Sequence, residues 1–253
     1  MGRTGQTEAG WVRIRVIACE VMLRELCYCT ARSRNTVDLV FLRRGLHSNP
    51  DTLREEVQAA IDATDEGECG AVALAYGLCS NGIAGLRARG IPLVVPRAHD
   101  CITLLLGSRE AYDERFATAP GTYYYTGGWI ERGDDTVPRR PEDGAGLDAS
   151  FEELVAKYGR DNAEYLWEVQ SSWIKYYTHA AHINTELGDI EAYRAYVRKI
   201  AAERGWEFDE IPGDLSLLQA LGDGEWDEAR FLVARPGEEI VARVGPEVME
   251  ARG

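Results

Sequence analysis

Short apolar runs alternate with helix-like segments along the first half of this chain. The strand-like runs are 12–18, 36–42, 71–76 and 91–95. Segments with helical spacing begin near residues 20, 50 and 101. Strands that alternate with helices pair in parallel through right-handed crossovers, so helices cover both faces of the sheet. The sequence therefore predicts an α/β fold with Rossmann-like layers: a parallel-dominated sheet with helices on both faces, plus a helical extension.

The predicted organisation is one domain with a helical extension. Residues 1–10 are predicted to be a disordered lead, and 11–131 the α/β core that carries the candidate site. Residues 132–147 are rich in Gly, Pro, Asp and Glu, which indicates a surface loop. Residues 148–253 are predicted to form helices, one of them from 162 to about 182, and C-terminal strands that complete the same domain.

Three of the predicted strands end close to a cysteine. Cys19 and Glu20 follow the first strand, Cys79 follows the third, and Cys101 follows the fourth. In open parallel sheets, ligands bind beyond the carboxyl ends of the strands. We therefore expect Cys19, Cys79 and Cys101 to converge on one pocket at that edge of the sheet.

Three cysteines in one pocket indicate a metal site. Thiolates bind zinc and iron–sulfur clusters, and three protein ligands leave one coordination position open. The metal hypothesis assigns Cys19, Cys79 and Cys101 as ligands of zinc or of an iron–sulfur cluster. The competing interpretation is that these cysteines are small buried apolar side chains, which is a common use of free cysteine. No CxxC spacing supports the metal, but GLCSNG and HDC are unusual sequences for plain core.

Other polar side chains beyond the same strands are candidates to surround the pocket. His99, Asp100 and Glu20 are the candidates for acid–base chemistry, although Asp100 is equally suited to cap the following helix. Candidates for substrate binding are Arg97, Asn81, Ser80, His47 and Tyr124. Each has a structural alternative, such as an ion pair for the arginine or a surface position for the histidine.

The remaining cysteines and histidines give weaker signals. Cys27 and Cys29 lie two apart on a predicted helix and point to different sides, so we expect at least one in the core. Cys69 is expected to be structural. His179 and His182 lie three apart on a predicted helix, on one face, which permits metal binding but supplies no third ligand.

The net charge of the chain limits the classes of molecule that it can bind. A net charge of −14 argues against binding to duplex nucleic acid or to an anionic membrane surface, since both require a basic face. No apolar run approaches the roughly 20 residues that span a bilayer, and the N-terminus lacks an apolar signal core. We therefore expect a cytoplasmic protein with reduced thiols.

Several of these motifs together resemble a known family. They are ACEV at 18–21, LH at 46–47 with Pro50, YGLCSNG at 76–82, PRAHDCITLLLGS at 96–108, PGTYY at 120–124, and FLV at 231–233 with Pro236 and Gly237. This set resembles the uncharacterised family called domain of unknown function 1638, and the run at 96–108 is its most specific part. Members of that family are often encoded beside corrinoid-dependent methyltransferase components. The resemblance thus implies a role in one-carbon chemistry by association.

Three functional hypotheses follow. In the first, the metal makes a nucleophile of a bound thiol or water, which suits methyl transfer to or from a small-molecule thiol or a corrinoid-protein partner. In the second, the protein is a non-catalytic accessory that holds a cofactor or delivers a metal for a methyltransferase system. In the third, no metal is involved and Cys79 or Cys101 is a nucleophile with His99 as its base. The sequence leaves open whether the protein is an enzyme.

Overall fold

A computed structural model describes residues 12–132, 155–156, 159–160, 162–164, 175–245 and 247–253. The chain forms two compact units, which we describe separately. Unit 1 comprises residues 1–115, 185–188 and 212–253, and unit 2 comprises 116–184 and 189–211. The predicted lead at 1–10 and nearly all of the predicted loop at 132–147 lie outside the described residues. The predicted boundary at residue 148 differs from this division, because strands on both sides of it belong to unit 2.

Unit 1 is built on a five-stranded sheet with the order β2-β1-β3-β4-β8. The strands are β1 (Arg13–Cys19), β2 (Thr36–Leu42), β3 (Ala71–Ala75), β4 (Leu93–Pro96) and β8 (Phe231–Ala234). The first four pair in parallel, and β8 adds to the edge of β4 in the antiparallel direction. The predicted α/β class with a parallel-dominated sheet is confirmed.

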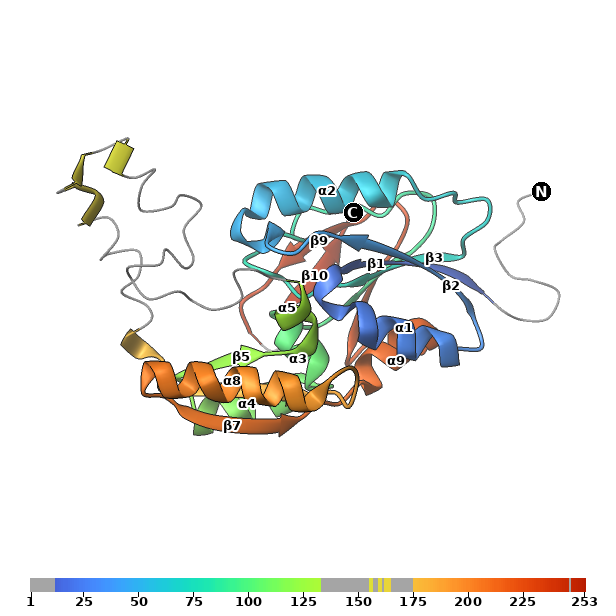
Figure 1. The fold of residues 1–253 in the computed structure, drawn as a ribbon. Helices are drawn as coiled ribbons and strands as arrows, with labels where there is room; N and C mark the ends of the chain where they lie inside the picture. Colours follow the sequence, from blue (N-terminus) through green and yellow to red (C-terminus); the bar gives the residue numbers. More distant parts are fainter. Residues whose placement is uncertain (1–11, 133–154, 157–158, 161, 165–174, 246) are drawn as a thin grey trace. The chain divides into compact units, whose positions relative to one another are not determined.

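Helices cover both faces of this sheet, with α2 on one side and α1 with α9 on the other (Figure 1). The helical elements of unit 1 are η1 (Glu20–Met22), α1 (Leu23–Arg32), η2 (Leu46–Ser48), α2 (Pro50–Asp62), α3 (Cys101–Leu105) and α9 (Ser216–Asp223). Helix α4 (Arg109–Thr118) begins in unit 1 and ends in unit 2. As predicted, α2 begins with proline, and the Asn49 side chain accepts a hydrogen bond from the Thr52 N–H at 3.2 Å. Across the described residues, no helix has the length and apolar character needed to cross a membrane.

The α2 face of the sheet holds a hydrophobic core. Side chains alternate between the two faces along a strand, so Ile17, Leu74 and Val95 share the face that packs against Leu53 and Val57 of α2. The residues at the carboxyl ends of β1 and β3 continue this face: Tyr76 belongs to the same cluster, and Cys19 and Cys79 pack against it. Apolar packing therefore extends to the strand ends, where the candidate site lies.

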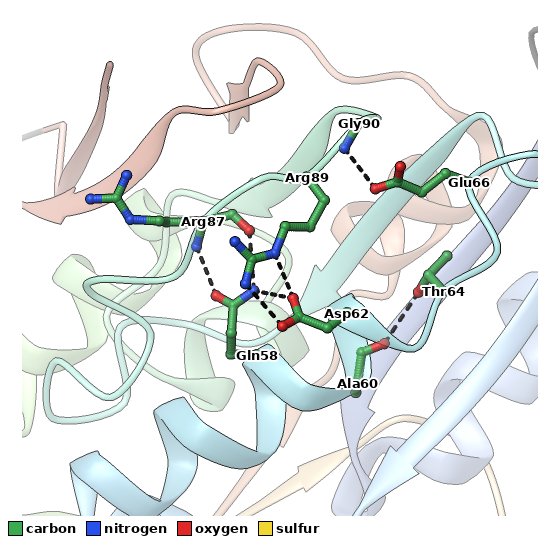
Figure 2. A network of polar contacts seen from close by, with 8 residues as sticks. All are labelled: Gln58, Ala60, Asp62, Thr64, Glu66, Arg87, Arg89 and Gly90. Carbon is green, nitrogen blue, oxygen red and sulfur yellow. Dashed lines mark hydrogen bonds and ion pairs between the residues drawn. The ribbon is translucent and has the colours of Figure 1, made fainter.

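A polar network ties the end of α2 to the segment that leads into β4 (Figure 2). Arg89 bonds both carboxylate oxygens of Asp62, at 2.6 and 2.9 Å, and this ion pair holds the pKa of Asp62 below its usual value. The amide oxygen of Gln58 accepts from the Arg87 N–H at 2.9 Å, while its NH₂ group donates to Asp62 at 2.7 Å. This network fixes the path of the chain between the loop after β3 and the start of β4.

A C-terminal hairpin completes unit 1. It consists of β9 (Glu239–Ala242) and β10 (Met249–Arg252), which pair in the antiparallel direction. Backbone hydrogen bonds join it to the segment before β4, including Gly85 N–H to Ile240 O at 2.8 Å and Ala88 N–H to Glu238 O at 3.0 Å. Neither strand was predicted from the sequence.

Unit 2 contains a three-stranded sheet with the order β5-β6-β7. Its elements are β5 (Thr122–Tyr125), α5 (Gly127–Glu131), β6 (His179–Asn184), α8 (Ile190–Arg204) and β7 (Glu207–Pro212). Tyr125 and Ala180 of the sheet pack against Val197 and Ile200 of α8. Asp189 caps α8 through a bond from the Ala192 N–H at 3.1 Å.

The predicted helix through His179 and His182 is wrong, because both residues lie on β6. Parallel pairing with β5 aligns Thr122 with His179 and Tyr125 with His182. Residues three apart on a strand face opposite sides of the sheet. His182 is accordingly buried, at 1 % exposure, while His179 is only partly buried. The two imidazoles therefore do not form the metal-binding pair that helical spacing suggested.

Candidate thiol site at the ends of the strands

The structure brings Cys19, Cys79 and Cys101 of unit 1 together. Cys19 is the last residue of β1, Cys79 lies in the loop after β3, and Cys101 is the first residue of α3 after β4. The thiols are close enough for electrostatic interaction, since Cys79 and Cys101 each interact with Cys19 and with one another. All three are partly buried. We call Cys19, Cys79 and Cys101 the thiol cluster.

Backbone contacts between two loops hold Cys79 beside Cys101. The Leu78 N–H donates to Ala98 O at 2.9 Å, and the Cys79 N–H donates to His99 O at 3.0 Å. Gly77 permits this approach, because a Cβ atom at that position would lie 2.5 Å from the backbone nitrogen of Asp100. The two strand ends are thus joined through main-chain atoms.

The loop after β3 has a strained backbone at the cysteine. Cys79, Ser80 and Asn81 have φ angles of 46°, 58° and 65°, so three successive non-glycine residues are left-handed. Such residues cost of order 1–3 kcal/mol each and persist only where the surrounding structure holds them. Arg54 of α2 holds this loop by donating to the Ala84 carbonyl and, at 3.3 Å, to the Asn81 carbonyl. Strain of this kind at a reactive side chain is typical of functional sites.

Tyr76 lies against the thiol cluster and was missed as a site residue. Its side chain is buried, with 4 % of the residue exposed, and its hydroxyl has no hydrogen-bond partner among the described residues. Burial raises the pKa of Tyr76 most, and Cys19, Cys79, Cys101 and Glu20 raise it further, so the phenol stays protonated. The available signal was its place in the sequence: a tyrosine that shares the core face of Leu74, directly before the reactive loop.

Two thiols of the cluster, those of Cys79 and Cys101, are difficult to ionise. Burial raises the pKa of Cys79 to about 12, with the Asp100 carboxylate as the second cause. The same two causes raise the pKa of Cys101 well above its usual value. The thiolate is the form that attacks electrophiles and binds metals. A thiolate here therefore needs a compensating positive charge, which argues against the metal-free nucleophile of the third hypothesis.

The two acidic candidates have structural hydrogen bonds. One carboxylate oxygen of Asp100 accepts from the Ile102 and Thr103 N–H groups at 3.0 and 3.2 Å, so Asp100 caps α3 as the sequence suggested. A carboxylate oxygen of Glu20 accepts from the Arg44 N–H at 2.8 Å. The Asp100 carboxylate interacts with Cys79 and Cys101, and Glu20 interacts with Tyr76; the predicted acid–base role of both carboxylates stays a prediction.

The predicted histidine and loop candidates lie on the outer side of the site. His47 is exposed in η2, yet desolvation of its ring lowers its pKa, as does Arg44, while the nearby Asp100 opposes the shift. His99, Ser80 and Asn81 are exposed. His47 interacts electrostatically with Asp100 of the site.

Arg97 and Tyr124 are placed differently from the other candidates. The Arg97 guanidinium donates to the carbonyls of Glu228, Glu247 and Met249 at 2.9, 2.8 and 2.7 Å. These bonds fasten the C-terminal hairpin to β4, a structural use that differs from the predicted binding of a substrate. Tyr124 lies in unit 2 and we do not include it in the site.

The other three cysteines, Cys27, Cys29 and Cys69, lie outside the thiol cluster. Cys29 and Cys69 are buried, in keeping with their expected structural roles, and Cys27 is exposed on α1. Within the described part of the chain, no group of three or more His, Cys, Asp or Glu side chains has the arrangement of a metal site. The thiol cluster therefore contains the sulfur donors that zinc and iron prefer, but these donors are not arranged around one point as in a metal site.

Comparison with known proteins identifies a family for this chain. The model of the family described as "Protein of unknown function (DUF1638)" matches residues 41–221. The matched span contains the loop after β3 and the whole run at 96–108, and it excludes β1 with Cys19. No curated protein and no solved structure matches the chain.

Proposed function

The chain belongs to the DUF1638 family, whose description names no activity, and we propose from the site itself that it is a metal-binding protein. In this proposal, Cys19, Cys79 and Cys101 hold zinc or an iron–sulfur cluster at the carboxyl edge of the sheet. One observation carries the proposal: three thiols from three different strand ends interact with one another and with a buried, unpartnered hydroxyl.

The residues present fit such a metal in three respects. The donors are soft sulfur atoms, and three of them leave one coordination position open. A cation offsets the burial and the carboxylate charge that raise the pKa of the Cys79 and Cys101 thiols. The backbone around Cys79 is held by Arg54 and by the close approach at Gly77, so the loop that carries this donor is fixed in place.

The protein supplies the surroundings of this position. When bound, zinc supplies Lewis-acid chemistry that lowers the pKa of a bound thiol or water, whereas an iron–sulfur cluster supplies electron transfer. The apolar α2 face, with Leu46 and Leu78, excludes water from one side of the cluster. Glu20 and Asp100 add negative charge, which favours a cation there over an anionic ligand. The corrinoid-linked methyl transfer that the family resemblance implies stays a prediction.

Metal analysis of anaerobically purified protein tests the proposal. We expect near-stoichiometric metal in the wild type, and loss of that metal in each of Cys19→Ala, Cys79→Ala and Cys101→Ala. The matched control is Cys27→Ala, which removes an exposed thiol outside the cluster and should retain the metal. An absorption spectrum of the same samples distinguishes a coloured iron–sulfur protein from a colourless zinc protein.

Two results contradict the proposal. One is a wild-type protein without metal in which a single thiol reacts rapidly with an alkylating reagent at neutral pH, which would favour cysteine chemistry. The other is metal that remains after all three cluster cysteines are replaced. Once metal is established, turnover with methylcobalamin and thiol acceptors separates an enzyme from an accessory protein.

A further inference from the structure

His182 of unit 2 is a buried histidine whose ring nitrogen Nδ1 has no hydrogen-bond partner among the described residues. Only 1 % of the residue is exposed. It lies on β6, where parallel pairing aligns it with Tyr125 of β5, so both side chains point to the face of the sheet that α8 covers. A buried polar atom without a partner calls for an explanation, and apolar packing does not require an imidazole at this position.

The His182 ring lies where α8 packs against the sheet. Its centroid is 6.2 Å from that of the Tyr193 ring, in the first turn of α8. The Tyr193 ring also lies against α5, since a Cβ atom at Gly127 would be 2.7 Å from Cε2 of Tyr193. The Tyr193 hydroxyl donates to the Glu131 carboxylate at the end of the same short helix. A change at His182 therefore acts on the contact that holds α8 at this end of the sheet.

The acidic groups around His182 are already paired. The titratable groups on the described elements that surround the ring are Tyr125 of β5, Glu131 of α5, Tyr193 and Arg194 of α8, and Glu210 of β7. Arg194 bonds both carboxylate oxygens of Glu210, and Asn184 donates to the same carboxylate at 3.1 Å. Glu131 accepts from Tyr193. A positive charge on His182 would thus be buried beside Arg194, with the nearby carboxylates already bonded.

We propose that His182 is an acid-sensitive switch of unit 2, and that protonation of its buried ring releases α8 from the sheet. A buried charge is costly unless it is paired and hydrogen-bonded, whereas an open form of unit 2 lets water hydrate the imidazolium. The inference is independent of the proposed metal.

The sign of the pH dependence follows from the burial of the ring. Burial lowers the pKa of His182 below the ordinary value of 6.5, and Arg194 lowers it further while Glu210 opposes the shift. The open form therefore binds a proton that the packed form does not. The packed form keeps its full stability above about pH 6.5 and loses stability as the pH falls from there toward the lowered pKa.

Hydrogen exchange of the full chain, from about pH 7.5 to about pH 5, tests the switch. After correction for intrinsic exchange, the open population of β6 and α8 should rise by up to about tenfold per pH unit below pH 6.5, because opening takes up one proton. His182→Met fills the space without titrating and should abolish this rise. The matched control is His179→Met on the other face of β6, beside Glu207, which should keep the wild-type pH dependence. Helix α2 of unit 1 serves as the internal reference.

A second measurement needs no variant that must fold. In an NMR titration of the four histidines, the His182 ring of the wild type should still be neutral at about pH 6, where an ordinary histidine is mostly protonated. A His182 ring that titrates at pH 6.5 or above overturns the switch. So does an opening of β6 and α8 that is independent of pH, persists in His182→Met or disappears in His179→Met. None of these results depends on the thiol cluster, so the proposed function is tested separately.

Discussion

Gly77→Ala is expected to lower the free energy of unfolding by about 3 kcal/mol and to weaken metal binding at the thiol cluster. A Cβ atom at this position would lie 2.5 Å from the nitrogen and 2.7 Å from the Cα of Asp100, and 2.8 Å from the carbonyl carbon of His99. All three are backbone atoms, so no side-chain rotation can relieve the overlap. The loops that carry Cys79 and Cys101 would have to separate. Chemical denaturation and metal content of the purified variant measure the two effects.

Gly222→Ala is the matched control for this substitution. Gly222 is buried in α9, where the nearest atom to an added Cβ is the Thr30 methyl group, at an ordinary contact distance of 3.6 Å. Alanine is favoured over glycine inside a helix by roughly 0.5–1 kcal/mol, so this variant should be at least as stable as the wild type. If Gly77→Ala is as stable as Gly222→Ala, the close approach of the two loops is not a feature of the protein.

Arg97→Met is expected to destabilise unit 1 by about 2 kcal/mol while the metal content stays unchanged. The variant keeps much of the apolar stem of the side chain but removes a charged donor from three carbonyls. Two of these carbonyls belong to the C-terminal hairpin: Met249 is the first residue of β10, and Glu247 lies two residues before it. Chemical denaturation measures the loss of stability. Hydrogen exchange should show increased opening of the hairpin with little change in α2.

Arg89→Met provides the comparison for the loss of an arginine. Arg89 pairs with Asp62 in an exposed ion pair, and such pairs contribute at most about 1 kcal/mol. This variant should therefore lose less stability than Arg97→Met. A stable Arg97→Met protein that has lost a bound ligand would instead support the binding role that the sequence suggested for Arg97.

The sheet of unit 1 could be predicted because its strands are dense in apolar and β-branched residues. The predicted run 36–42 coincides with β2, and β1 begins and ends one residue later than predicted. The convergence of the thiol cluster could be predicted as well, since the carboxyl ends of parallel strands meet at one edge. Local composition and sheet topology were sufficient for these features.

Other features depend on contacts between segments far apart in the sequence. Arg97 bonds carbonyls more than 130 residues away, and no local pattern reports such partners. The left-handed loop at Cys79 has no glycine at the strained positions, so its conformation is set by neighbours such as Arg54. In unit 2, HAAHIN lacks a clear period, and pairing with β5 determined that it is a strand.

Titration of the reduced protein with Co²⁺ under argon tests the central claim most directly. If the three thiols share one pocket, absorption from thiolate-to-cobalt charge transfer should saturate at one ion per chain. It should weaken with each of Cys19→Ser, Cys79→Ser and Cys101→Ser, and persist in Cys27→Ser. The absence of this absorption in the wild type, or its loss only when Cys27 is replaced, would show that the cluster does not bind metal.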